Sequence, residues 1–123
     1  MKIYRCFRCG NILAKIEDKS EALTCCGEAL KELEVNTSDG AHEKHLPVYE
    51  MKDNDCVVRV GEVDHPMSEE HYIMWILVER SDGYSIKYLN PGDEPTATFL
   101  NTSDIKAIYA YCNLHGLYKT TVL

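Results

Sequence analysis

The stretch IKAIYAYCNLHG, residues 105–116, decides the fold of the larger part of the chain. Residues 105–112 alternate in the manner of a β-strand, and a glycine closes the stretch. Cys112 and His115 stand between them, three positions apart. A thiol and an imidazole at this spacing occur in copper sites, in iron sites, as a nucleophile with its base, and as buried side chains without chemistry. The stretch therefore predicts a strand whose end carries a candidate site.

Short β runs separated by turn formers make up most of the sequence after residue 40. The segments at residues 81–83 and 90–93 consist of Ser, Asp, Gly, Asn and Pro, and both predict tight turns. The predicted strands are residues 48–51, 56–63, 72–79, 84–89, 96–100, 105–112 and 117–122. Seven short strands without a convincing helix predict an all-β fold, a seven-stranded immunoglobulin-like β-sandwich.

The first 36 residues form a smaller unit. They contain four of the six cysteines and only short apolar runs, so they cannot bury enough apolar surface to fold unaided. A bound metal ion would supply the missing stabilisation. Residues 36–40, with the sequence NTSDG, are turn formers without an apolar side chain. We therefore predict a metal-stapled domain at residues 1–36 and the sandwich at residues 37–123.

The charge balance excludes some classes of function. Thirteen Lys and Arg against 20 Asp and Glu give a formal charge of −7, which argues against nucleic-acid binding. An anionic substrate would need a local positive patch to overcome this background of negative charge.

No stretch approaches the ~20 apolar residues of a membrane span. We expect a cytoplasmic protein with no membrane association, whose cysteines are reduced and are better explained by metal binding than by disulfides.

The four N-terminal cysteines are arranged as two pairs. Cys6 and Cys9 are separated by two residues and followed by Gly10, a spacing that lets both sulfurs reach one ion. The second pair, Cys25 and Cys26, is adjacent, which requires different backbone angles from a second C-x-x-C. Four thiolates suit zinc or a single iron, and both readings stay open on the spacing alone.

A second set combines histidines with one cysteine at loop and strand ends: His45, His65, His71, Cys112 and His115. Any one of these histidines alone would more often be a hydrogen-bonded surface or core residue. A blue-copper site would need an axial ligand, commonly Met, soon after the last histidine, and none follows. A Cys-His catalytic pair leaves three histidines unexplained. Four imidazoles and one thiolate fill five positions of an octahedral ion and suit iron that changes oxidation state.

One further cysteine and one further histidine are predicted not to be metal ligands. Cys56 shares strand parity with Val58 and Val60, so we expect a small buried residue with no chemical role. His42 lies in a polar loop and is expected to be exposed.

With these motifs in place, the chain resembles the desulfoferrodoxin family of two-iron superoxide reductases over essentially its whole length. The resemblance rests on C-x-x-C-G and C-C-G in the first 36 residues, on DGAHEKH at 39–45, on HPM at 65–67 with His71, and on YCNLHG at 111–116. It implies a desulforedoxin-like first domain in which Cys6, Cys9, Cys25 and Cys26 hold one iron. It also implies that His45, His65, His71 and His115 bind a second iron equatorially, with Cys112 as the axial ligand.

The resemblance further implies an enzyme that reduces superoxide to hydrogen peroxide without producing dioxygen. Within the family motif, Lys44 is expected to assist at the open coordination position, and Glu43 to occupy that position in the oxidised resting state. A rubredoxin-type electron donor and a homodimer are expected by family analogy. The competing interpretation is a non-catalytic iron electron-transfer or metal-binding protein.

Overall fold

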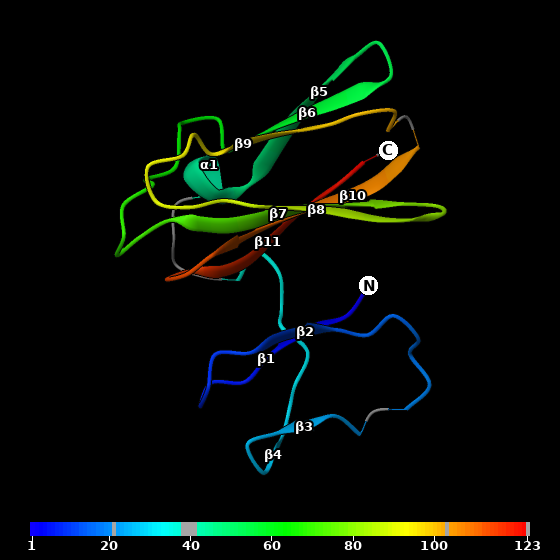
Figure 1. The fold of residues 1–123 in the computed structure, drawn as a ribbon, viewed down its shortest axis with the longest axis vertical. Helices are drawn as coiled ribbons and strands as arrows, with labels where there is room; N and C mark the ends of the chain where they lie inside the picture. The colour runs from blue at the N-terminus through cyan, green and yellow to red at the C-terminus, as the bar shows by residue number, and fades with distance from the viewer. Residues whose placement is uncertain (21, 38–41, 103, 123) are drawn as a thin grey trace. The chain divides into compact units, whose positions relative to one another are not determined.

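The computed structural model describes all residues except 21, 38–41, 103 and 123, and it does not place the side chains of His42 and Glu43. The chain divides into two compact units, residues 1–34 and residues 35–123, which are described separately (Figure 1). The turn formers predicted at residues 36–40 lie outside the described residues from residue 38 onward. In the described part of the chain, no helix is long and apolar enough to cross a membrane.

The first unit is built from two small antiparallel hairpins. Strands β1 (Ile3–Arg5) and β2 (Ile12–Ala14) form one, and β3 (Thr24–Cys25) and β4 (Glu28–Ala29) form the other. Its buried hydrophobic side chains, among the described residues, are those of Ile3, Tyr4 and Cys6. So few buried groups contribute little hydrophobic stabilisation, which agrees with a fold held together by a metal ion.

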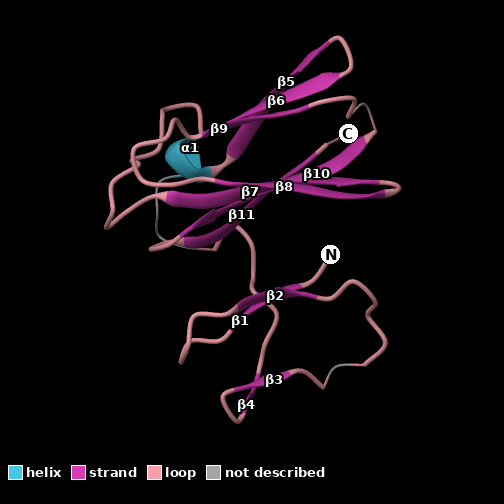
Figure 2. Cartoon of the chain, viewed as in Figure 1, coloured by secondary structure: helices cyan, strands magenta, loops and turns pink. Residues whose placement is uncertain are grey.

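Among its described residues, the second unit contains one helical turn, α1 (His42–His45), and seven strands in two antiparallel sheets (Figure 2). The three-stranded sheet has the order β5-β6-β9, and the four-stranded sheet has the order β11-β10-β7-β8. The strands are β5 (Pro47–Lys52), β6 (Asp55–Val60), β7 (Ile73–Arg80), β8 (Gly83–Tyr88), β9 (Thr96–Phe99), β10 (Ile105–Cys112) and β11 (Gly116–Thr121). The predicted seven-stranded sandwich is therefore confirmed.

The core lies between the two sheets and is built from alternate residues of their strands. Cys56, Val58 and Val60 of β6 are fully buried and face Ile108 and Ala110 of β10 in one cluster. Cys56 is thus a core residue, as its strand parity predicted, and burial raises the pKa of its thiol.

Most strand bounds differ from the sequence-based expectation by one residue, and two local features differ by more. The strand predicted at residues 56–63 ends at Val60, because Gly61 begins a turn that leads toward His65. The expectation of no helix is wrong for one turn, α1. That turn ends at His45 because Leu46 precedes Pro47, and the residue before a proline disfavours helical backbone angles.

A β-bulge shapes the end of the four-stranded sheet where Cys112 lies. Tyr111 pairs with Trp75, whereas the next residue, Cys112, pairs with Ile73, so β7 carries one extra residue opposite β10. Bulges of this kind re-aim side chains and are frequent next to functional sites. Here Ile73 and Cys112 both belong to the buried core.

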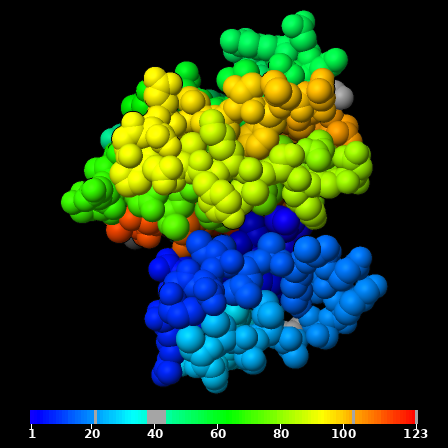
Figure 3. Space-filling view, viewed as in Figure 1, coloured from blue at the N-terminus to red at the C-terminus, as the bar shows by residue number. Residues whose placement is uncertain are grey.

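Strand β8, which forms one edge of the four-stranded sheet, leaves several large side chains in contact with solvent. Tyr84, Ile86 and Tyr88 alternate along the strand and are exposed. The strand and the segment that follows it lie at the surface in Figure 3, in yellow-green and yellow. Lys87 places a charge on this edge, a feature that opposes edge-to-edge association of sheets.

Candidate metal centres

The four N-terminal cysteines converge in the first unit. Their sulfur atoms all lie within 4.8 Å of one another. Cys25 Sγ is 3.6 Å from Cys9 Sγ and 4.0 Å from Cys26 Sγ. Metal–sulfur bonds of about 2.3 Å in a tetrahedral site would place the sulfurs roughly 3.8 Å apart. The observed separations fit one tetrahedrally bound ion.

Both hairpins contribute their turns to this centre. The backbone N–H groups of Arg8 and Cys9 hydrogen-bond to the sulfur of Cys6, forming a knuckle. In the second hairpin Cys25 pairs with Glu28, so Cys26 and Gly27 form a two-residue turn with φ of 52° and 76°. Positive φ at both central residues is the type I′ pattern. This turn supplies the altered backbone angles that the adjacent cysteines were predicted to require.

The close approach of the four sulfurs shifts the pKa values of these thiols in opposite directions. The N–H groups of Cys9 and Arg8 lower the pKa of Cys6 to about 7. Hydrogen bonding between the Cys26 thiol and the sulfurs of Cys9, Cys6 and Cys25 favours its protonated form and raises its pKa to about 12. Four thiolates this close would repel one another strongly, and a bound metal ion would compensate for that repulsion and let all four ionise.

The second cluster lies in the β-sandwich and contains four imidazole rings. Neighbouring ring centroids are 4.5 Å apart for His45–His65, 4.6 Å for His65–His71, 5.0 Å for His71–His115 and 4.7 Å for His115–His45. The rings of His45 and His71 are 6.1 Å apart. The four rings therefore form a closed square in which His45 is opposite His71. Adjacent rings are steeply inclined, at angles from 74° to 87°.

The ring nitrogens face the centre of this square. His45 Nε2 lies 2.9 Å from His65 Nε2 and 3.0 Å from His115 Nδ1. Metal–nitrogen bonds of about 2.0–2.1 Å separate neighbouring nitrogens by roughly 2.9–3.0 Å. His71 Nε2 is buried and has no hydrogen-bond partner among the described residues. An orphaned buried nitrogen of this kind is expected where a metal ion supplies the partner.

The tautomer of His65 is fixed by its neighbour. His65 Nδ1 is 2.6 Å from the carbonyl oxygen of Pro66 and donates its proton there, which leaves the Nε2 lone pair facing the centre. Burial lowers the pKa of His65 to about 4 and lowers that of His71. Both imidazoles are therefore neutral near pH 7, the form that binds metal ions.

Cys112 completes the cluster from the end of β10. Its sulfur and the ligand nitrogens of His45, His65 and His71 all lie within 4.8 Å of one another. It is 3.8 Å from His115 Nδ1. Burial raises the pKa of the thiol, while backbone N–H groups of His115 and Leu114 lower it. Those two donors would stabilise a thiolate once a cation is present.

The hairpin between β10 and β11 explains the Cys-x-x-His spacing. Cys112 pairs with Gly116, so the three residues between them form the loop. Gly116 has φ of 87°, the left-handed angle that closes a three-residue hairpin loop. This turn brings His115 back toward Cys112.

Tyr118 is a neighbour of the centre that the sequence-based prediction did not include. Its ring stacks on His45, with centroids 4.6 Å apart and an interplanar angle of 20°. It is fully buried and pairs with Ala110 on β10. The sequence could have indicated this position, because Tyr118 lies in the predicted strand, two residues after Gly116. Pairing with Ala110 places it on the same face of the sheet as Ala110 and Cys112.

The remaining predicted site residues lie on α1. Lys44 is exposed, next to His45, and its positive charge contributes to lowering the pKa of His71. The side chains of Glu43 and His42 lie outside the described part of the structure, so the predictions made for them stay predictions.

Two separate clusters of candidate metal ligands, one of cysteines and one of histidines with a cysteine, are the arrangement expected of an all-β metalloprotein with a β-sandwich domain. Comparison with known proteins narrows this class. The sequence model of the desulfoferrodoxin family matches residues 37–121. The chain belongs to the desulfoferrodoxin family.

Relatives agree over nearly the whole length. The chain is 47% identical over 119 residues to desulfoferrodoxin of Nitratidesulfovibrio vulgaris, covering 96% of this chain and 94% of that protein. It is 46% identical to the desulfoferrodoxin homolog of Archaeoglobus fulgidus, covering 98% and 96%. The crystal structure of the superoxide reductase from Treponema pallidum has a TM-score of 0.79 at 32% identity, covering 98% of this chain and all of that one.

Proposed function

We propose that this protein is a superoxide reductase. One superoxide, one electron and two protons would give one hydrogen peroxide, so no dioxygen is formed. The observation that carries the proposal is the square of four imidazoles with nitrogens 2.9 and 3.0 Å apart and a buried cysteine sulfur beside it. Membership of the family, which includes proteins named superoxide reductase, supports the same activity.

We assign the five ligands of the second centre to His45, His65, His71, Cys112 and His115. Iron bound there would supply the electron that reduces superoxide. Imidazole binds a metal ion as a neutral ligand and a cysteine thiolate adds one negative charge, so a divalent ion held by these five residues would keep a net positive charge that attracts an anion. The loop N–H groups of Leu114 and His115 would hold charge on the sulfur.

Lys44 is proposed to guide superoxide to the centre. The protein carries a formal charge of −7, so a positive side chain near the centre would raise the local concentration of the anion. Its exposure and its electrostatic effect on His71 support this role. For Glu43, whose side chain is not described, we propose by family resemblance that it occupies the open position in the oxidised state.

The four-cysteine centre lies in a domain that we place at residues 1–36. We propose that it holds the other iron ion of the chain. The S···S separations of 3.6 and 4.0 Å and the two hairpin turns support a tetrahedral site. A rubredoxin-type protein is proposed as the electron donor, in a cytoplasmic enzyme that functions as a homodimer. These last assignments rest on the family resemblance.

A metal assay combined with rapid kinetics tests the proposal. Protein purified in air should contain two irons per chain, show thiolate-to-iron absorption and consume superoxide in a pulse-radiolysis experiment. Zinc in one centre would overturn the iron assignment of that centre. Two bound irons without superoxide consumption would instead identify an electron-transfer or metal-binding protein.

A further inference from the structure

Asn113 joins the two loops that carry the ligands of the histidine–cysteine centre. Its side-chain oxygen accepts a hydrogen bond of 2.9 Å from the backbone N–H of Tyr72, and its side-chain NH2 donates one of 3.0 Å to the carbonyl of Glu70. Its own N–H donates to the carbonyl of Tyr72 at 3.2 Å. Three hydrogen bonds thus connect segments more than 40 residues apart in the sequence.

The two residues that Asn113 binds lie on either side of His71. On the other loop, Asn113 directly follows Cys112. Asn113 therefore ties the backbone on both sides of one ligand to the backbone next to another. Among the described residues, the backbone hydrogen bonds of His71 are local: its N–H donates to the hydroxyl and carbonyl of Ser68, and its carbonyl accepts from the N–H and the hydroxyl of Ser68. They shape the loop but do not connect it to Cys112.

We propose that Asn113 is a positioning residue that sets the separation between the imidazole of His71 and the sulfur of Cys112. An amide is suited to this role because it accepts with its oxygen and donates with its nitrogen, matching the N–H of Tyr72 and the carbonyl of Glu70 at once. Ionised Asp lacks the donor, and Ala lacks both groups. The inference rests on the metal centre of the proposed function.

The orphaned nitrogen of His71 explains why such a constraint matters. Nε2 of His71 has no hydrogen-bond partner among the described residues, so its direction depends on where the backbone of the loop is held. His65, by contrast, is oriented by its own bond to Pro66. Partners that orient metal ligands typically change metal affinity about 10–100-fold when they are removed.

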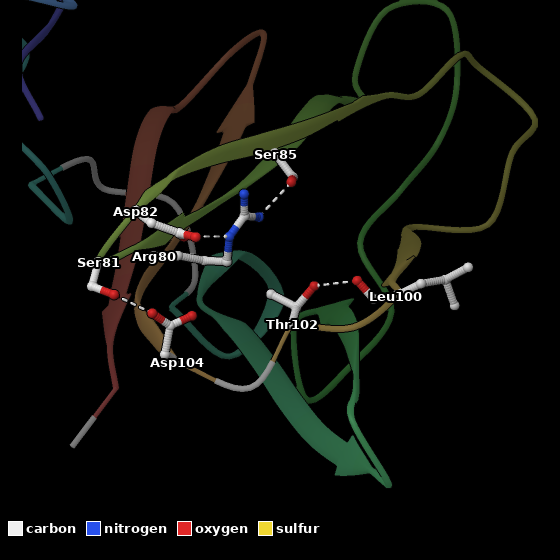
Figure 4. Close-up of polar contacts among 7 residues, drawn as sticks. All are labelled: Arg80, Ser81, Asp82, Ser85, Leu100, Thr102 and Asp104. Atoms are coloured by element: carbon white, nitrogen blue, oxygen red, sulfur yellow. Dashed lines mark hydrogen bonds and ion pairs between the residues drawn. The ribbon is translucent and has the colours of Figure 1, made fainter.

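The test uses the full iron-loaded chain with Asn113→Ala, Asn113→Asp and the control Thr102→Val. Thr102 is buried and donates a 2.7 Å hydrogen bond to the carbonyl of Leu100, as Figure 4 shows. Its removal also costs a buried hydrogen bond. Between Ile105 and Cys112, β10 alone spans about 23 Å, so this control lies far from the centre.

Two quantities are measured: the rate at which a chelator removes iron from each centre, and the position of the thiolate-to-iron absorption band of the histidine–cysteine centre. Asn113→Ala should release that iron about 10-fold faster and shift the band, while the absorption of the four-cysteine centre stays unchanged. Thr102→Val should leave both quantities within about twofold of wild type. Asn113→Asp, which keeps the acceptor and loses the donor, should change them in the same direction and decides the matter if Asn113→Ala does not fold.

A wild-type release rate and band in the Asn113 variants would overturn the positioning role, as would equal acceleration by Thr102→Val. Absence of iron from the histidine–cysteine centre of the wild type would instead overturn the proposed function, so the two failures are distinguishable.

Discussion

Replacing Gly116 with Ala should lower the metal affinity of the histidine–cysteine centre and leave the metal affinity of the four-cysteine centre unchanged. Gly116 has φ of 87°, and a Cβ added there meets no atom within 4 Å. The cost is therefore backbone strain alone, about 1–2 kcal/mol for a residue with a side chain in the left-handed region. Loss of chain entropy in the unfolded state offsets about 0.4–1 kcal/mol of it. A net cost of about 1 kcal/mol remains.

This strain acts on the loop that carries Cys112 and His115, so it opposes metal binding directly. If the loop relaxes when the metal leaves, about 1 kcal/mol corresponds to roughly a fivefold loss of affinity. Gly27→Ala provides the matched control. Gly27 has φ of 76°, also meets no atom within 4 Å, and follows Cys26 in the turn of the four-cysteine centre.

Chelator titrations followed at the absorption bands of the two centres would measure both effects in one sample. Gly116→Ala should shift only the titration of the histidine–cysteine centre, and Gly27→Ala only that of the four-cysteine centre. Equal weakening of both centres by either variant, or no weakening by Gly116→Ala, would refute the link between hairpin geometry and metal binding.

Three further predictions concern single residues. Cys112→Ser should abolish the thiolate absorption and the superoxide reductase activity of the histidine–cysteine centre while the other centre keeps its spectrum; an unchanged spectrum would remove Cys112 from the ligand set. Lys44→Ile should lower the second-order rate with superoxide and flatten its dependence on ionic strength, whereas equal rates and salt slopes in pulse radiolysis would make Lys44 a surface residue only. Because burial lowers the pKa of His65 to about 4, its contribution to stability is fully present above about pH 6.5 and is lost as the pH falls through 4. Urea unfolding of chelator-stripped protein should therefore give a stability that declines below pH 6.5, with a smaller decline in His65→Asn; equal slopes for the two proteins would contradict the assignment.

The strands were the part of the structure that the sequence predicted best. Runs such as Ile105–Cys112 alternate with the period of a strand, and turn formers separate them, so local pattern and hydrophobic burial point to the same assignment. The burial of Cys56 followed from the same parity. The helical turn at His42–His45 was missed because it is a single turn, too short to show a helical period.

The residue types of both centres were also evident in the sequence, from the cysteine pairs and from a motif resemblance. Their arrangement was not. The order of the four histidines in the square, and the position of His45 opposite His71, depend on how separate loops meet in space.

Tertiary contacts decided how each of these side chains is aimed. Gly116 turns His115 back toward Cys112, and a bulge in β7 lies opposite Cys112 at the end of β10. Tyr118 stacks on His45, and Asn113 holds the loop of His71. The sequence by itself determined which side chains were present and which strands would form, because these depend on local pattern. Only the folded structure determined their distances and directions, because these depend on contacts between segments apart in the chain.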